Sequence, residues 1–447
     1  MKKSKTILIT LLNNFFVPLS SVRMSNKARR EGTLIRAFGI TALAILILVG
    51  ITGAAPFAYV TSPGIATETI FVIDTATNNL KAVVPVEGWP RDIAVNPVGT
   101  KVYVVTPGIS TATVSVIDTA TNKVSATVDV GGYPMQVAVN PAGTKVYVTD
   151  RDGTNISLID TSTNTLMAQI NVGMITRNVV ISPDEKKIYA TNPFNNTISV
   201  IDAITNKVIT TISVENSPYE VAFAPDGNKV YVTNLDSNTV SVIDTATDNV
   251  TATVSVGNSP SDIAVSPDGK KAYVTNSGNY NDPGNTVSVI DTVTNTVTAT
   301  VHVGITPLGV AITPDGKKVY VTNAESDNVS VIDTATNKVI ATVNSGKYTI
   351  NYPTGVAIGP IIYTNMTGQS TRTASNATED IGVEETEFSS SEEKKAVEFN
   401  NSNNNNSESD NGNSPGENDS SKNISTPGFL LFESLICLYG GWKFSKK

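Results

Sequence analysis

The chain of 447 residues is 40% hydrophobic, 6% aromatic and only 16% charged, a composition typical of small β-branched strands and not of a helical enzyme. Its formal net charge of −8 at pH 7 argues against a nucleic-acid partner, because such a partner selects a basic surface. With one histidine and one cysteine in the whole chain, we expect no catalytic residues, no metal site and no cofactor.

Residues 1–57 are predicted to form a basic segment followed by an export signal or a membrane anchor. Basic residues from Lys27 to Arg36 precede an uncharged run from Ala37 to Thr67. Such a run suits either a cleaved signal or a helix that spans a bilayer, and the basic flank stays on the cytoplasmic side. Both interpretations place the rest of the chain outside the cytoplasm, while cleavage and a start at Met1 or Met24 stay open.

Residues 58–365 contain seven copies of a unit of about 42 residues. Each copy offers four short segments in which apolar and polar residues alternate, the period of a strand covered on one face. The sequence therefore predicts an all-β fold, a seven-bladed propeller of four-stranded antiparallel blades. An Ile-Asp pair closes one strand in every copy, with the aspartate at Asp74, Asp118, Asp160, Asp202, Asp244, Asp291 and Asp333.

Two kinds of turn recur in the copies. Pro-Asp-Gly, as in Pro225 to Gly227, suits a tight hairpin because proline presets the first turn residue and glycine accepts a positive φ. Glu185 stands where one such glycine is expected, so its hairpin must turn without glycine. The aspartate of each Ile-Asp pair is expected to accept hydrogen bonds from turn amides and not to bind calcium.

The two ends of the repeat region are expected to share one blade. The first copy lacks its own first strand, and Gly355 to Ile358 supplies such a segment at the end. This segment should complete the blade that the strand near Tyr59 begins, which closes the ring. Because Ile361 to Asn365 duplicates the strand near Tyr59, the sequence leaves open which of the two copies pairs in the closing blade.

The recurring Tyr-Val-Thr-Asn, as in Tyr231 to Asn234, resembles the YVTN family of β-propeller repeats, as do the Pro-Asp-Gly and Val-Ile-Asp-Thr elements. That family is common in archaeal surface-layer proteins, so the resemblance implies the propeller fold and a place at the cell surface. It extends over the whole repeat region. It implies little about activity, because a shared fold does not carry a function with it.

After the repeats, residues 366–426 are rich in Asn, Ser, Thr and Glu, and we expect a disordered acidic stalk. Residues 427–447 begin with Pro427, Gly428 and Phe429, continue with an apolar run and end in lysines. This order resembles the PGF-CTERM sorting signal of archaeal surface proteins, which implies cleavage and lipid attachment by an archaeosortase. A plain C-terminal hydrophobic anchor is the alternative, and Glu433 interrupts the apolar run.

Sequons for N-glycosylation occur in the propeller and in the stalk, and export would make them candidate acceptors. They lie at Asn155, Asn195, Asn249, Asn328, Asn376, Asn400, Asn405, Asn418 and Asn423.

One face of the propeller is expected to carry the interactions. The connections between blades, and those between second and third strands, share this face and differ from copy to copy, with the largest loops at Pro107 to Thr113 and Asn276 to Asn285. Residues just before each first strand should ring the mouth of the central channel and suit a polar ligand. These candidates are Arg91, Asp92, Gln136, Arg177, Asn178, Tyr219, Glu220 and Asp262.

Together these features predict a non-catalytic structural or adhesion propeller at the cell surface, anchored to membrane or lipid through its terminal segments. Its expected partners are envelope proteins or surface glycans. Two alternatives stay open. One is a ligand-binding sensor, and the other is a metal-dependent, lactonase-like hydrolase with a divalent ion near Asp92, Glu220 and Asp262.

Overall fold

The computed structural model describes residues 56–64, 68–108, 112–344 and 350–360. All described residues belong to one compact unit of the chain. The predicted export signal, stalk and Pro-Gly-Phe motif lie outside the described residues, as do the sequons from Asn376 onward. Within the described ranges, no helix has the length and apolar character needed to cross a bilayer.

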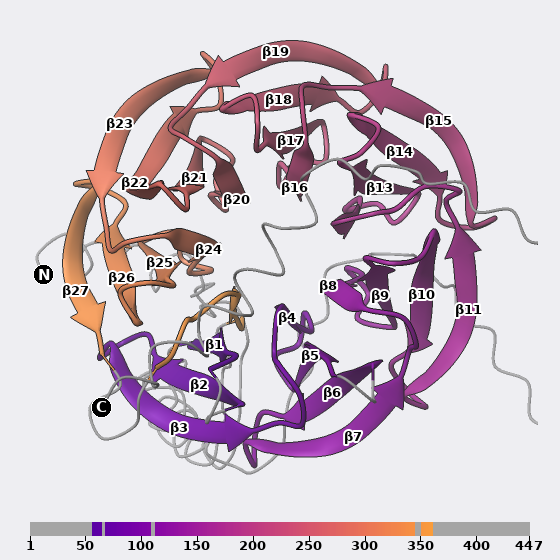
Figure 1. Cartoon of the computed structure of the whole chain (residues 1–447), viewed down its shortest axis with the longest axis horizontal. Helices are drawn as coiled ribbons and strands as arrows, with labels where there is room; N and C mark the ends of the chain where they lie inside the picture. The colour runs from indigo at the N-terminus through magenta and orange to yellow at the C-terminus, as the bar shows by residue number, and fades with distance from the viewer. Residues whose placement is uncertain (1–55, 65–67, 109–111, 345–349, 361–447) are drawn as a thin grey trace, which may run out of the picture. The chain divides into compact units, whose positions relative to one another are not determined.

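The strands form seven four-stranded antiparallel sheets around a common axis, which confirms the predicted seven-bladed propeller (Figure 1). The innermost strand of each blade lies nearest the axis. In chain order the innermost strands are β4 (Ile93–Val95), β8 (Pro134–Val139), β12 (Val179–Ile181), β16 (Pro218–Phe223), β20 (Pro260–Val265), β24 (Pro307–Ile312) and β28 (Val356–Ile358). The second strands are β1 (Phe57–Ser62), β5 (Lys101–Pro107), β9 (Lys145–Asp150), β13 (Lys187–Asn192), β17 (Lys229–Asn234), β21 (Lys271–Asn279) and β25 (Lys318–Asn323).

The third and fourth strands complete each blade toward its outer edge. The third strands are β2 (Thr69–Asp74), β6 (Ala112–Asp118), β10 (Asn155–Asp160), β14 (Thr197–Asp202), β18 (Thr239–Asp244), β22 (Asp282–Asp291) and β26 (Asn328–Asp333). The fourth strands are β3 (Asn79–Pro85), β7 (Lys123–Asp129), β11 (Thr165–Asn171), β15 (Lys207–Ser213), β19 (Asn249–Ser255), β23 (Thr296–His302) and β27 (Lys338–Val343). Second and third strands are buried along most of their length, whereas the outer strands expose most of their residues.

The hydrophobic core lies between neighbouring blades. One cluster joins Tyr231 and Val242 of one blade to Ile263 and Val274 of the next, and six similar clusters complete the circle. Each repeated tyrosine, as at Tyr231, is fully buried at such an interface. A single blade cannot bury its own faces, so the blades are stable only as neighbours in a closed ring.

The ring closes as predicted from the sequence. Strand β28 pairs antiparallel with β1, so that Val356 lies opposite Val60 and Ile358 opposite Ala58. The closing blade has the order β28-β1-β2-β3, with the C-terminal strand innermost. Strand β1 is therefore the copy that pairs with β28, while the duplicate at Ile361 to Asn365 lies outside the described residues.

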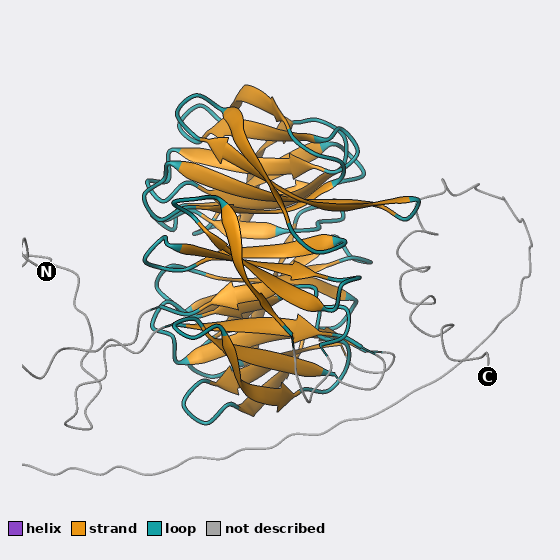
Figure 2. Cartoon of the chain, turned by 90° about the vertical axis from the view of Figure 1, so that its left-hand side faces the viewer, coloured by secondary structure: helices purple, strands orange, loops and turns teal. Residues whose placement is uncertain are grey.

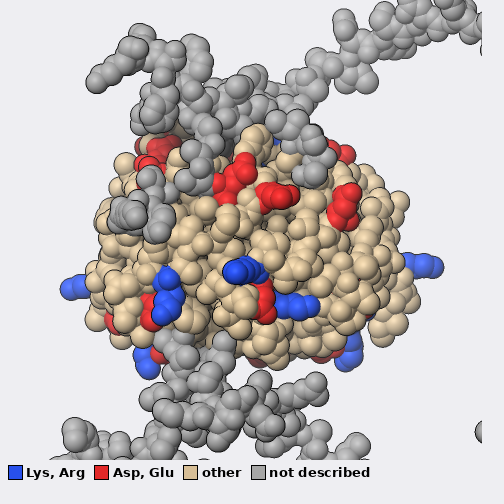
Figure 3. Space-filling view, turned by 90° about the horizontal axis from the view of Figure 1, so that it is seen from below, with Lys and Arg blue, Asp and Glu red and all other residues tan. Residues whose placement is uncertain are grey.

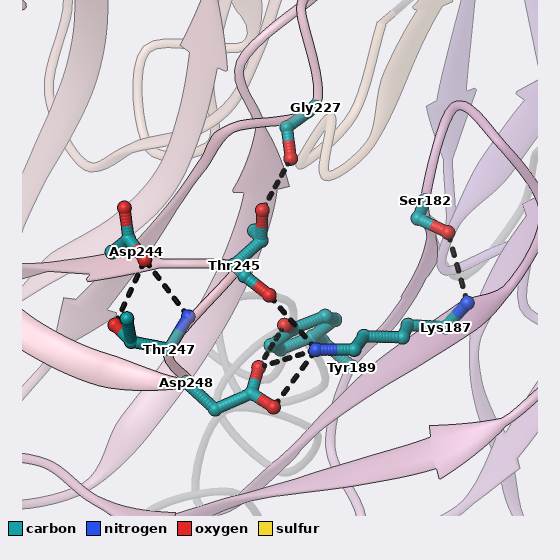
Figure 4. Close-up of polar contacts among 8 residues, drawn as sticks. All are labelled: Ser182, Lys187, Tyr189, Gly227, Asp244, Thr245, Thr247 and Asp248. Carbon is teal, nitrogen blue, oxygen red and sulfur yellow. Dashed lines mark hydrogen bonds and ion pairs between the residues drawn. The ribbon is translucent and has the colours of Figure 1, made fainter.

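One face, which we call the turn face, carries the connections between first and second strands and between third and fourth strands. Its aspartates act as predicted, since Asp244 accepts hydrogen bonds from the Thr247 amide at 2.9 Å and its hydroxyl at 2.8 Å (Figure 4). Glu185 adopts a φ of 58° in the hairpin that lacks glycine. Its carboxylate accepts hydrogen bonds from Asn140 and Ala142 in the preceding blade, a role that glycine could not fill.

Lysines at the start of second strands tie the turn face of one blade to the next. Lys187 donates to the Thr245 carbonyl at 2.8 Å and forms an ion pair with Asp248 at 2.8 Å, and the Tyr189 hydroxyl donates to the same carboxylate at 2.5 Å (Figure 4). The corresponding lysines Lys101, Lys229, Lys271 and Lys318 each donate to the equivalent carbonyl of the following blade. The sequence repeat therefore encodes a contact between neighbouring blades as well as the fold of each blade.

The opposite face, which we call the variable face, carries the remaining connections. The segment expected as a loop at Asn276 to Asn285 instead extends the pairing of β21 with β22 as far as Asn279 opposite Asp282. This ribbon projects from the disc in Figure 2. A Cβ on Gly278 would lie 2.1 Å from the Gly284 nitrogen, so glycine permits the close backbone approach that sequence reasoning took for a loop.

Candidate functional site

Seven equivalent positions, each just before the apolar run of an inner strand, surround the propeller axis on the variable face. We call them the axial ring, and in blade order they are Asp92, Gln136, Asn178, Glu220, Asp262, Gly309 and Gly355. Five consecutive blades thus contribute polar side chains and two contribute none. At Gly309 a Cβ would lie 2.5 Å from the Thr354 carbonyl oxygen, so the neighbouring blade leaves no room for a side chain there.

Threonines of the Tyr-Val-Thr-Asn motif hold the ring backbone in place. The Thr191 hydroxyl accepts a hydrogen bond from the Asn178 amide at 2.9 Å and donates to the Tyr219 carbonyl of the next blade at 3.2 Å. Thr149, Thr275 and Thr322 make the same pair of contacts at their own interfaces. Sequence reasoning missed this role, although the threonine recurs in the motif.

Glu220 is the ring residue that joins three blades. It extends from β16 so that one carboxyl oxygen accepts a hydrogen bond from the Gln136 amide of β8 at 2.8 Å. Its other carboxyl oxygen meets the Asn178 amide, at the start of β12. An amide group presents either a donor or an acceptor according to its orientation, so these two neighbours can accommodate Glu220 as a carboxylate or as the neutral acid.

Asp92 and Asp262 make the same kind of hydrogen bond as each other, and it differs from those of Glu220. The Asp92 carboxylate accepts the Val137 amide of the next blade at 2.9 Å, and the Asp262 carboxylate accepts the Val310 amide at 2.7 Å. Each therefore bonds the inner strand that follows it around the axis. Part of the role of both aspartates is structural, because each satisfies a backbone donor at a blade interface.

The three ring carboxyl groups have raised pKa values. Burial raises the pKa of Asp92 to about 7 and that of Asp262 to about 6, against the opposing effect of the backbone amides. The pKa of Glu220 lies well above its ordinary range, first because of burial and then because of the negative charges of Asp262 and Asp92. The ring therefore brings together carboxyl groups with raised pKa values, close enough for the charges of Asp92 and Asp262 to act on Glu220.

Arg177 is the cation that acts on these carboxyl groups. Its positive charge opposes the rise in the pKa of both Glu220 and Asp92. The guanidinium stacks 3.7 Å from the centre of the Tyr219 ring and donates to the Tyr219 hydroxyl. The stacked pair stands beside the ring at the positions preceding Asn178 and Glu220, where it can border a bound ligand.

The structure brings most of the predicted candidates together. Gln136, Asn178 and Glu220 are in direct contact, and the charges of Asp92, Arg177 and Asp262 act on Glu220. Tyr219 contacts Arg177, whereas Arg91 takes part through its backbone carbonyl, which accepts a hydrogen bond from Thr354 at 2.7 Å. The propeller sequons lie at the variable or turn face, with Asn195 and Asn249 exposed and Asn155 and Asn328 half-buried.

The arrangement differs from that of a metal centre. Among the described residues, no three His, Cys, Asp or Glu side chains are grouped closely enough to hold an ion, and this includes Asp92, Glu220 and Asp262. The histidine of the chain, His302, is exposed on the outer strand β23.

Two family models match separate parts of the propeller. The cytochrome D1 heme domain matches residues 100–222, and the seven-bladed β-propeller lactonase matches residues 243–357. Neither match reaches half of the chain. No curated protein matches the sequence.

Solved structures share the fold over most of the propeller. A functionally unknown protein from Desulfotomaculum acetoxidans is 19% identical with a TM-score of 0.60, covering 68% of this chain and 99% of its own. A protein described as a 6-phosphogluconolactonase from Bacteroides uniformis is 20% identical with a TM-score of 0.56, covering 68% and 99%. Hydrazine synthase from Kuenenia stuttgartiensis is 24% identical with a TM-score of 0.55, covering 64% and 97%. Identities this low establish the fold alone.

The expectation of a non-catalytic structural or adhesion module is wrong. Both matched family models describe propellers of enzyme type, and two of the similar structures are named as 6-phosphogluconolactonases. The scarcity of histidine and cysteine does not exclude catalysis, because buried carboxyl groups can perform acid and base chemistry without either residue.

A haem does not fit the axial ring. Histidine is the commonest metal ligand in proteins, and the single histidine of this chain lies exposed on β23, away from the innermost strands. The ring itself offers carboxyl and amide groups, and the nearby Tyr219 hydroxyl is bound by Arg177. The matched haem-domain model therefore reflects the propeller fold and not a haem site in these residues.

Proposed function

We propose that the protein is a lactonase-like hydrolase whose active site is the axial ring. The observation that carries the proposal is the pair of half-buried ring carboxyl groups, Glu220 and Asp262, whose pKa values are both raised, that of Asp262 to about 6 and that of Glu220 well above its ordinary range because of burial and the Asp262 charge. Such a pair supplies an acid and a base at the same pH. The match of residues 243–357 to the lactonase model supports the same reaction class.

The two carboxyl groups divide the reaction between them. Water adds to the carbonyl carbon of the cyclic ester while the Asp262 carboxylate accepts its proton. The ring C–O bond then breaks, and Glu220 donates its proton to the leaving oxygen to give a hydroxy acid. One water is consumed, and transfer of a proton from Asp262 through solvent to Glu220 restores the starting state.

Other ring residues hold this pair in position. Gln136 and Asn178 fix the Glu220 carboxyl from two preceding blades, and the Val310 amide fixes Asp262. Asp92 adds a negative charge that keeps the proton on Glu220. The backbone amides of Gln136, Asn178, Glu220 and Asp262 each donate to a threonine of the adjoining second strand, which holds the site's backbone in place.

The test measures acid release by the full chain on a panel of γ- and δ-lactones, with subtraction of spontaneous hydrolysis. We expect Glu220→Gln and Asp262→Asn to lower kcat on the best substrate by about 10²- to 10⁴-fold, the usual contribution of general acid or base catalysis. The matched control is Asp226→Asn, an exposed carboxyl group on the turn face, which should leave the rate unchanged. A folded wild-type protein that hydrolyses none of the lactones would refute the proposal.

We further propose that this enzyme works outside the cytoplasm, attached to the membrane through its terminal segments and carrying glycans at exposed sequons. The uncharged run from Ala37 to Thr67 and the Pro427 to Phe429 motif support this location. Mass spectrometry of the native protein from a membrane fraction tests it. Intact ends and bare asparagines in a protein found wholly in the cytoplasm would contradict it.

A further inference from the structure

Charge is distributed unequally between the two faces of the propeller. In the side view of Figure 3, acidic side chains gather along one rim, whereas basic side chains lie along the other together with further acids. The described lysines lie at the turn face or, as Lys81 does, near the start of an outer strand that leads from it. Besides the ring carboxyl groups, the connections of the variable face carry Glu68, Glu87, Glu215, Asp236, Glu325 and Asp327.

The cations of the variable face are few and largely engaged. Among the described residues, this face carries Arg91, Arg151 and Arg177 and no lysine. Arg151 forms an ion pair with Asp152 at 2.9 Å and stacks 3.9 Å from the centre of the Tyr133 ring. Arg177 stacks on Tyr219 and faces the ring carboxyl groups. A ligand that approaches the ring therefore meets a predominantly negative surface.

We propose that the ring selects an uncharged, hydroxyl-bearing lactone and discriminates against a phosphorylated one. This inference rests on the proposed hydrolase function and specifies its substrate class. It differs from the activity named for the 6-phosphogluconolactonase structures, whose substrate carries a phosphate. The charge of the variable face determines which lactone is preferred, because the catalytic pair alone could hydrolyse either one.

Phosphate groups and hydroxyl groups make different demands on a binding surface. A phosphate monoester carries a charge of about −1.5 to −2 near pH 7, and proteins bind it with clusters of arginine or lysine or with helix N-termini. On the described part of this face the arginines are few, and Arg151 and Arg177 are engaged with acidic or aromatic side chains. Hydroxyl groups, by contrast, donate readily to carboxylate and amide oxygens. The ring offers such acceptors in the half-buried carboxyl groups of Asp92, Glu220 and Asp262.

The experiment compares glucono-δ-lactone with its 6-phosphate on the full-length protein. We expect kcat/KM to favour the neutral lactone by at least about tenfold at low ionic strength, and the gap to narrow with added salt because salt screens exposed charges. Equal or faster hydrolysis of the phosphorylated lactone would overturn the inference and leave the proposed function intact. Hydrolysis of neither substrate, with other lactones also inert, would instead overturn the proposed function and the inference with it.

A charge-reversed variant tests whether the preference comes from surface charge or from the shape of the site. Glu87→Lys combined with Glu215→Lys changes two exposed side chains outside the ring, and we expect kcat/KM for the 6-phosphate to rise several-fold with little change for the neutral lactone. Asp226→Lys on the turn face is the control and should change neither value. Calorimetry with gluconate and 6-phosphogluconate gives a readout independent of turnover, and tighter binding of the phosphorylated product would also overturn the inference.

Discussion

The turn face and the variable face use the same residue type in opposite ways. On the turn face the pKa of Asp244 is lowered, chiefly by the Thr247 hydroxyl that donates to it. In the axial ring the pKa of Asp262 is raised to about 6 by burial. Every blade uses the first arrangement to close its outer hairpin, whereas carboxyl groups occupy only three of the seven ring positions. Repetition therefore marks what the fold requires, and departure from repetition marks where chemistry can lie.

The largest effect on stability should come from removing a ring charge. The pKa of Asp92 is raised in the folded state, so the folded protein binds a proton that the unfolded chain releases, and stability falls as pH rises from about 4 to about 7. Asp92→Asn should thus stabilise the protein at pH 8.5 by on the order of a few kcal/mol and change its stability little at pH 4. Water around this half-buried side chain screens its charge and makes the gain at pH 8.5 smaller.

Urea unfolding at both pH values measures this difference, and an equal shift at pH 4 and pH 8.5 would show that the Asp92 charge is not the cause. The same variant tests the electrostatic link to Glu220. Loss of the Asp92 charge lowers the pKa of Glu220, so the alkaline limb of the pH profile for lactone hydrolysis should move to lower pH.

The threonine hydrogen bonds allow a second comparison, between blades that have this threonine and a blade that lacks it. Thr322→Val removes the acceptor of the Gly309 amide and the donor to the Thr354 carbonyl, both at 2.7 Å, and should cost about 1–3 kcal/mol in thermal or urea unfolding. Val105 already occupies the equivalent position in another blade, so Val105→Thr is the matched control. A Thr322→Val protein as stable as wild type would mean that these hydroxyl groups do not hold the ring together.

A smaller effect is expected on the turn face. Asp248→Ala removes the partner of Lys187 and Tyr189 and should lower stability by about 1–2 kcal/mol. Asp248→Asn restores the residue that the other blades carry, as at Asn337, and should cost much less. Differential scanning calorimetry distinguishes the two. Equal losses would indicate that the charge, and not the hydrogen bonding, matters at this interface.

The smallest effect should follow Glu185→Gly. Glycine relieves the positive φ of 58°, a gain of about 0.5–1 kcal/mol. It also removes the hydrogen bonds to Asn140 and Ala142, which cost a similar amount to lose. We expect the Tm to change by no more than a few degrees, and a large drop would show that the contact between blades outweighs the backbone strain.

The fold could be predicted well from the sequence because the same strand and turn motifs occur in every copy of the repeat. Pro-Asp-Gly and Ile-Asp-Thr specify turns from neighbouring residues alone, and the missing first strand near Tyr59 predicted the partner at Val356. The extended ribbon at Gly278 escaped prediction, since close backbone approach depends on both strands at once. The candidate ring residues were also predicted, because they are the positions that vary while their flanks repeat.

The sequence by itself thus determined the number of blades, their turns, the closure and the list of residues around the axis. Only the tertiary structure decided that Glu220 reaches Gln136 two blades away, that Asp92 and Asp262 bond the next inner strand, and that their pKa values rise. Local patterns encode interactions between residues close in the chain. The properties of a buried carboxyl group depend instead on charges and solvent exclusion contributed by blades far apart in sequence, and these exist only once the ring is closed.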